Sequence, residues 1–177
     1  ASTLAETKPA FSILFYPVIT AEKGKGHQGS FNALLGGSRN AESDTWYSLQ
    51  NRVTAQTPPT LLLLSDDDKV VPPVNSTLYY NALKEHGVKA SMHIYPTGGH
   101  GWGIRDHFEY KEQWQQATLD WLKELNDDRN TASVLLRQPG LPGCVDVGIR
   151  PATSRKSAGR ELAEAAVQAA VQEFGQQ

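Results

Sequence analysis

Residues 60–72 read Thr-Leu-Leu-Leu-Leu-Ser-Asp-Asp-Asp-Lys-Val-Val-Pro, and this stretch decides the fold class. The apolar run 60–64 is too short for a helix and follows two prolines, so it predicts a strand. Because the run has no polar alternation, the strand is expected to be buried on both faces. Strands of this kind are typical of parallel sheets that are covered by helices.

Two similar runs lie on either side of this strand in the sequence. Residues 11–16 stop at Pro17, and residues 91–95 stop at Pro96, so both are predicted to be strands. Between the second and third strands, residues 76–86 have helical spacing, and Gly87 follows as a natural end. A helix of about 17 residues follows the third strand, with one apolar stripe formed by Tyr110, Trp114, Ala117, Trp121 and Leu125. Strands separated by helices predict an α/β fold with a parallel sheet and flanking helices.

Composition divides the chain near Asp127. Of the 15 aromatic residues, 14 lie in residues 1–127, whereas residues 128–177 are rich in proline and glycine and end in one amphipathic stretch. We therefore expect a folded portion, 1–127, and a loop-rich tail, 128–177, with a C-terminal helix.

The charge and the cysteine content exclude several classes of protein. The net charge is −2, which gives no basic excess to bind a nucleic acid, and one cysteine excludes a disulfide framework. The apolar runs are too short to cross a membrane, and no targeting segment is visible.

Two loops follow the second and third predicted strands, where parallel sheets place functional residues. The first loop contains Asp66, Asp67 and Asp68, and the second contains His100 between glycines. A carboxylate that accepts a hydrogen bond from one imidazole nitrogen leaves the other nitrogen free to act as a base. The other two aspartates are expected to be solvated, and no further ligand spacing supports a metal site.

The two loops resemble those of the α/β-hydrolases, and most closely those of bacterial esterases related to acetyl-xylan esterases, dienelactone hydrolases and prolyl oligopeptidase. Residues 65–73, Ser-Asp-Asp-Asp-Lys-Val-Val-Pro-Pro, resemble the acid loop of this family, and residues 95–103, Tyr-Pro-Thr-Gly-Gly-His-Gly-Trp-Gly, resemble its histidine loop. The resemblance covers roughly residues 1–125. It implies that Asp68 is the acid and His100 the base of a catalytic triad.

The resemblance also implies a substrate class, a small ester or an acylated plant carbohydrate, and a reaction that needs no cofactor and no metal. It is compatible with a parent protein that is secreted or periplasmic. Trp102, two residues after His100, is a candidate wall of the substrate pocket, and packing in the core is its alternative role.

The chain departs from the family pattern at the nucleophile. The family carries its serine in a Gly-x-Ser-x-Gly turn, and no such motif occurs in this sequence. The resemblance places the nucleophile before Ala1, so the chain alone is predicted to be inactive. Ser157, in Ser-Ala-Gly, is a weak alternative candidate for the nucleophile, because Arg155 occupies a position where the turn requires glycine.

Two other functions remain open. A degenerate hydrolase module could associate with other proteins, or with itself, through an open sheet edge. Residues 24–29, Gly-Lys-Gly-His-Gln-Gly, match the dinucleotide fingerprint in letters, but they do not follow a strand directly, so a surface loop is the competing interpretation.

Overall fold

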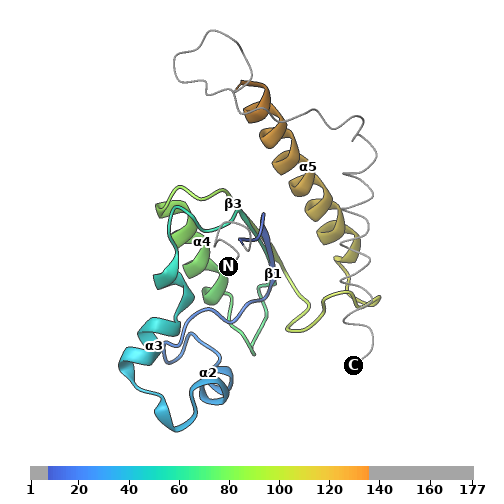
Figure 1. Cartoon of the computed structure of the whole chain (residues 1–177). Helices are drawn as coiled ribbons and strands as arrows, with labels where there is room; N and C mark the ends of the chain where they lie inside the picture. The colour runs from blue at the N-terminus through green and yellow to red at the C-terminus, as the bar shows by residue number, and fades with distance from the viewer. Residues whose placement is uncertain (1–7, 136–177) are drawn as a thin grey trace. The chain divides into compact units, whose positions relative to one another are not determined.

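Three strands form a parallel sheet in the order β1-β2-β3 (Figure 1). They are β1 (Ser12–Phe15), β2 (Thr60–Ser65) and β3 (Ala90–Tyr95). The structure is a computed structural model that describes residues 8–135. The strands match the three predicted runs within one residue at each end, and the α/β class expected from the sequence is confirmed.

The strand register places the ends of β2 and β3 together. Thr60 pairs with Ala90 and Ser65 pairs with Tyr95, so the two strands finish at the same level of the sheet. The backbone N–H of Asp66 continues the ladder by donating to the carbonyl oxygen of Tyr95 at 2.8 Å. The loops that follow therefore leave the sheet side by side.

The central strand is the most buried element of the sheet. Leu61, Leu62 and Leu63 are 0% exposed and Leu64 is 2% exposed, because β2 has a strand on each side and is covered on both faces. Each such leucine contributes about 1.5–3 kcal/mol of transfer free energy relative to an exposed one. The four consecutive leucines are thus explained by the position of β2 in the sheet.

Helices lie between the strands and after the last of them. They are α2 (Gln28–Leu35), α3 (Ala41–Tyr47), α4 (Val74–Glu85) and α5 (Lys111–Leu135), with short 3-10 helices η1 (Gly36–Ser38) and η2 (Leu49–Arg52). The crossover α4 links β2 to β3 and contacts both strands. It ends where predicted, since Gly87 has a φ of 69° and its N–H donates to the carbonyl oxygen of Lys84.

The chain divides into two units, Ala1–Trp114 and Gln115–Gln177. The sheet and both loops lie in the first unit. Helix α5 has 25 residues, which is longer than predicted, because no proline or glycine interrupts the chain before Pro139. It therefore runs through Asp127, and the boundary expected there remains a prediction.

The connection between β1 and β2 contains structure that the sequence analysis does not anticipate. Two short helices, α2 and α3, occupy residues that carry little apolar periodicity (Figure 1). Polar caps set their first residues: His27 accepts from the N–H of Ser30, and Asn40 and Ser43 form a reciprocal capping box. The stretch 24–29 is consequently the turn that leads into α2. Strand β1 ends at Phe15, well before Gly24, so the strand that a dinucleotide fingerprint requires is not in place.

Asn75 ties this connection to the start of α4. Its side chain is fully buried, and its Oδ1 accepts from the N–H groups of Ile19 and Thr20 at 3.0 and 3.1 Å. Its Nδ2 donates to the carbonyl oxygens of Lys25 and Pro72 at 2.7 and 3.0 Å. One amide thus satisfies four backbone groups, and it fixes the segment after β1 against the acid loop.

Candidate active site

Asp68 is buried at the turn that follows β2. Its Oδ1 accepts from the backbone N–H groups of Val70 and Val71, both at 2.9 Å. Its Oδ2 lies 2.8 Å from Nδ1 of His100, which stands in the loop after β3. The structure therefore brings together the acid and the histidine that the sequence analysis selects, although their catalytic roles remain predictions.

The geometry determines which nitrogen of His100 is available. An ionised carboxylate only accepts hydrogen bonds, so Nδ1 must carry the proton and Nε2 keeps its lone pair. The Asp68 side chain is 0% exposed, whereas the His100 side chain is 30% exposed. A fixed, buried acid behind a partly exposed imidazole is the arrangement that general base catalysis requires.

Tyr16 forms a further side of this site. It is the first residue after β1, its φ is 36°, and its ring centroid lies 4.5 Å from that of His100. Burial raises the pKa of the Tyr16 hydroxyl, against smaller lowering effects of the Gly103 backbone and of Arg105. A non-glycine residue in this backbone region is uncommon and often marks a functional site. The sequence analysis does not select it, and its position directly before Pro17 favours extended backbone rather than a positive φ.

Trp102 is buried among other side chains rather than exposed to solvent. It is 2% exposed, it stacks on Phe108 at 4.0 Å between ring centroids, and its Nε1 donates to Oγ of Ser65 at 2.8 Å. Edge contacts with the rings of Phe15 and Tyr16 complete its surroundings. The packing alternative fits these contacts, and a role for Trp102 in substrate binding remains an untested prediction.

The remaining histidines have other surroundings. His27 caps α2, and Nδ1 of His86 lies 2.9 Å from the carbonyl oxygen of Ala82. His93 is half-buried in β3, and His107 is exposed. No group of three or more His, Cys, Asp or Glu side chains within residues 8–135 could hold a metal ion. Ser157 lies outside the described residues.

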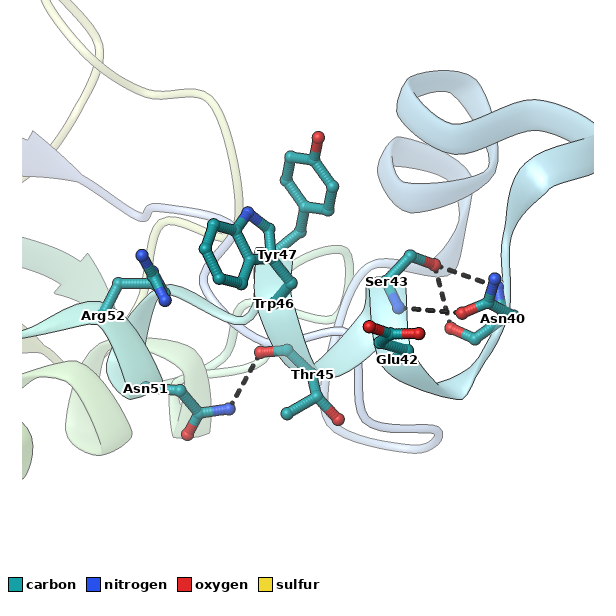
Figure 2. A pocket seen from close by; sticks show the side chains of 8 residues that line it. All are labelled: Asn40, Glu42, Ser43, Thr45, Trp46, Tyr47, Asn51 and Arg52. Carbon is teal, nitrogen blue, oxygen red and sulfur yellow. Dashed lines mark hydrogen bonds between the residues drawn. The ribbon is translucent and has the colours of Figure 1, made fainter.

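An open hollow of about 620 Å³ lies along α3 and η2, away from the residues selected above. Figure 2 shows the side chains that line it, Arg52 and Trp46 among them. The guanidinium carbon of Arg52 lies 3.7 Å from the centre of the Trp46 ring. Asn40 bonds to Ser43, and Asn51 donates to the carbonyl oxygen of Thr45. Its lining contains one carboxylate and no histidine, so the hollow offers no acid–base pair.

No helix within the described part of the chain is both long enough and apolar enough to span a membrane.

Two known proteins resemble the chain over about two thirds of its length. An acetylxylan esterase of Xylanibacter ruminicola is 40% identical over 124 residues, which are 68% of this chain and 26% of that protein. The solved acetyl ester-xyloside bifunctional hydrolase of Caldicellulosiruptor lactoaceticus is 37% identical with a TM-score of 0.63, over 67% of this chain and 43% of that one.

A carboxylesterase of Lactobacillus plantarum extends the likeness. It is 26% identical with a TM-score of 0.55, and the match covers 66% of this chain and 45% of that one. The chain thus spans about a quarter of this acetylxylan esterase and less than half of each of these two solved structures.

A family model gives the decisive match. The model of the prolyl oligopeptidase family covers residues 29–128, which is more than half of the 177 residues and includes both loops. Because this match covers more than half of its length, the chain belongs to the prolyl oligopeptidase family.

Proposed function

We propose that this chain supplies the acid and the base of a serine carboxylic-ester hydrolase. The observation that carries the proposal is the hydrogen bond between Asp68 and His100, with the carboxylate held from behind by two backbone N–H groups. This pair has the polarity and the partial exposure that a Ser-His-Asp triad needs. The esterases among the similar proteins support this reaction class.

Each residue has a defined role in this mechanism. His100 takes the proton of the attacking serine at Nε2, and Asp68 holds the opposite nitrogen and stabilises the imidazolium that forms. The serine attacks the ester carbonyl, the alcohol leaves with the proton returned by His100, and water then hydrolyses the acyl-enzyme by the same base. The reaction as written uses the side chains of the protein and water.

The serine of this mechanism is proposed to come from outside the printed sequence. No Gly-x-Ser-x-Gly turn occurs in the 177 residues, and the chain spans only 26% of the acetylxylan esterase that it resembles. Within residues 8–135, β1 pairs with β2 on one side only, so its other edge is available to a further strand. We propose that the strand preceding the nucleophile adds to this edge.

A second candidate function follows from the same free edge. An unpaired strand edge is a template for association with another chain. The alternative is therefore that the chain is a non-catalytic module and that a second copy of it pairs with this edge of β1. Sedimentation of the purified chain separates the two cases. A concentration-dependent dimer supports the association module, and a monomer at all concentrations contradicts it.

The proposed substrate is an acetylated or otherwise acylated plant polysaccharide. This class rests on the acetylxylan esterase and the acetyl ester-xyloside hydrolase among the similar proteins. A polymer of this kind is degraded outside the cytoplasm, so we propose a secreted or periplasmic location, which cell fractionation tests.

A chimera provides the direct test of the activity. The matching segment of the Xylanibacter ruminicola esterase is replaced by this chain, and release of acetate from acetylated xylan is measured. We expect activity in the chimera and its loss in H100A. The control is H107N, because His107 is exposed and lies outside the pair. An active chimera whose H100A variant keeps full activity would refute the proposal.

A fluorophosphonate probe on the 177-residue chain tests the source of the serine. We expect no labelled serine, because no residue of the sequence lies in a nucleophile turn. Stoichiometric labelling of Ser157 would contradict this expectation and would identify Ser157 as the nucleophile.

A further inference from the structure

Asp67 reaches across from the acid loop to the histidine loop. Its Oδ1 accepts from the backbone N–H of Gly99 at 2.8 Å, and its Oδ2 accepts from the N–H of Gly98 at 3.3 Å. The sequence analysis expects this side chain to be solvated only. It is exposed, yet both of its oxygens hold the two residues that precede His100.

Asp67 binds Gly98 and Gly99, and glycine does not by itself restrict the backbone to one conformation. Gly98 has a φ of 134° and Gly99 a φ of 63°, conformations that glycine reaches freely among many others. A Cβ at Gly98 would lie 2.4 Å from the ring of Phe108, so this position also requires glycine for space. Two adjacent glycines are costly in conformational entropy to order, and hydrogen bonds to a charged carboxylate offset that cost.

Ser65 also holds this loop, through two hydrogen bonds. Its buried Oγ donates to the carbonyl oxygen of Thr97 at 3.2 Å and accepts from Nε1 of Trp102 at 2.8 Å. The residues on either side of His100 are therefore attached to the end of β2, through Ser65 and Asp67. Of these two side chains, Asp67 is the one that accepts hydrogen bonds from the two residues directly before the histidine.

We propose that Asp67 is a positioning residue that sets the backbone before His100 so that Nδ1 of the imidazole meets Asp68. This inference rests on the proposed function, in which that contact orients the base. The two consecutive aspartates have different partners in the histidine loop. Asp68 binds the imidazole of His100, and Asp67 binds the backbone directly before it. Sequence order makes this possible, because consecutive residues of the turn present their side chains to different parts of the neighbouring loop.

The test compares D67A and D67N with D66A in the intact 177-residue chain. Asp66 is the matched control, because it is adjacent and exposed, and removing its carboxylate changes the net charge by the same amount. Nitrogen-15 NMR records solvent exchange of the Gly98 and Gly99 amides, the tautomer of His100 and the exchange of its Nδ1 proton. Circular dichroism verifies that each variant is folded.

In D67A we expect both amides and the Nδ1 proton to exchange at least about tenfold faster, as the loss of charge-assisted hydrogen bonds implies. We expect a smaller change in D67N, which keeps one acceptor oxygen, and wild-type behaviour in D66A. If D67A does not fold, D67N decides by the same readouts. A His100 ring that keeps its tautomer and its slow Nδ1 proton in both Asp67 variants overturns the inference.

The test of Asp67 and the test of the proposed function give independent results. A slow Nδ1 proton that disappears in D68N supports the acid–base pair whatever Asp67 does. In the chimera, a positioning role lowers kcat in D67N while KM stays near its parent value, because the substrate contacts are unaffected. Equal kinetics of the D67N and D66N chimeras contradict the positioning role and leave the pair intact.

Discussion

Oδ2 of Asp68 lies 2.8 Å from Nδ1 of His100, although the two residues are 32 positions apart in the sequence. Parallel pairing of β2 with β3 produces this contact, since both strands end at the Ser65–Tyr95 pair. The backbone N–H groups of Val70 and Val71 fix the other oxygen of the acid, so the carboxylate cannot rotate without losing two hydrogen bonds.

The substitution D68N tests the orientation of this acid. The two N–H groups behind it select the amide oxygen of an asparagine, so its NH₂ group faces His100. The imidazole must then accept at Nδ1 and carry its proton on Nε2, the wrong tautomer for a base. We expect the tautomer change in nitrogen-15 spectra of the chain, and about 10⁴-fold lower kcat in the chimera. Retention of the Nδ1–H tautomer in D68N would contradict this account of the acid.

Replacing Asn75 tests the link between the segment after β1 and α4. N75A removes the partner of three backbone groups, the N–H groups of Ile19 and Thr20 and the carbonyl oxygen of Lys25. The carbonyl oxygen of Pro72 loses one donor and keeps the backbone N–H of residue 75. Each unsatisfied buried group costs about 1–3 kcal/mol, less where water enters, so we expect at least about 3 kcal/mol of lost stability. Urea unfolding measures this loss. The control is N81A on the exposed face of α4, which should change stability by less than about 0.5 kcal/mol.

The two glycines before His100 should respond differently to alanine. G99A introduces only backbone strain, because its φ is 63° and no atom lies near the added Cβ, so we expect about 1–2 kcal/mol of lost stability. G98A has a φ of 134° and also places a Cβ against Phe108 and Ser65, so it should cost clearly more. Thermal unfolding of both variants measures the difference. A smaller loss in G98A than in G99A would show that the loop relaxes.

Alkaline pH should weaken the fold through Tyr16. Burial raises the pKa of this hydroxyl above its ordinary value, so the folded state binds the proton more tightly than the unfolded state does. The associated stability is fully present below about pH 10 and is lost as the pH rises through the folded pKa. Y16F removes this group, so its stability should fall less steeply above pH 10 in urea unfolding. Burial also raises the pKa of Tyr79 and Tyr95, which keeps a residual pH dependence in the variant.

The sheet could be predicted because its signals are local, whereas the choice of Asp68 among three aspartates as the partner of His100 came from the family resemblance. Unbroken apolar runs next to prolines define the strands, such as Thr60–Ser65 after Pro58 and Pro59, and parallel order then brings the loops together. Helices α2 and α3 were not predicted, because they are short and are set by polar caps such as Asn40 rather than by an apolar stripe. Tyr16 and Asp67 were missed for another reason. Their roles depend on backbone geometry and on contacts across loops, which periodicity does not encode.

The burial of Asn75 has a practical consequence for producing the protein. Residues 75–77, Asn-Ser-Thr, form an acceptor sequon for N-linked glycans, and in the folded chain its amide is 0% exposed and bonded on both atoms. A yeast or insect secretion host that attached a sugar to the nascent chain at this site would block the four bonds on which the turn depends. Bacterial hosts without this modification are therefore the better choice for its expression.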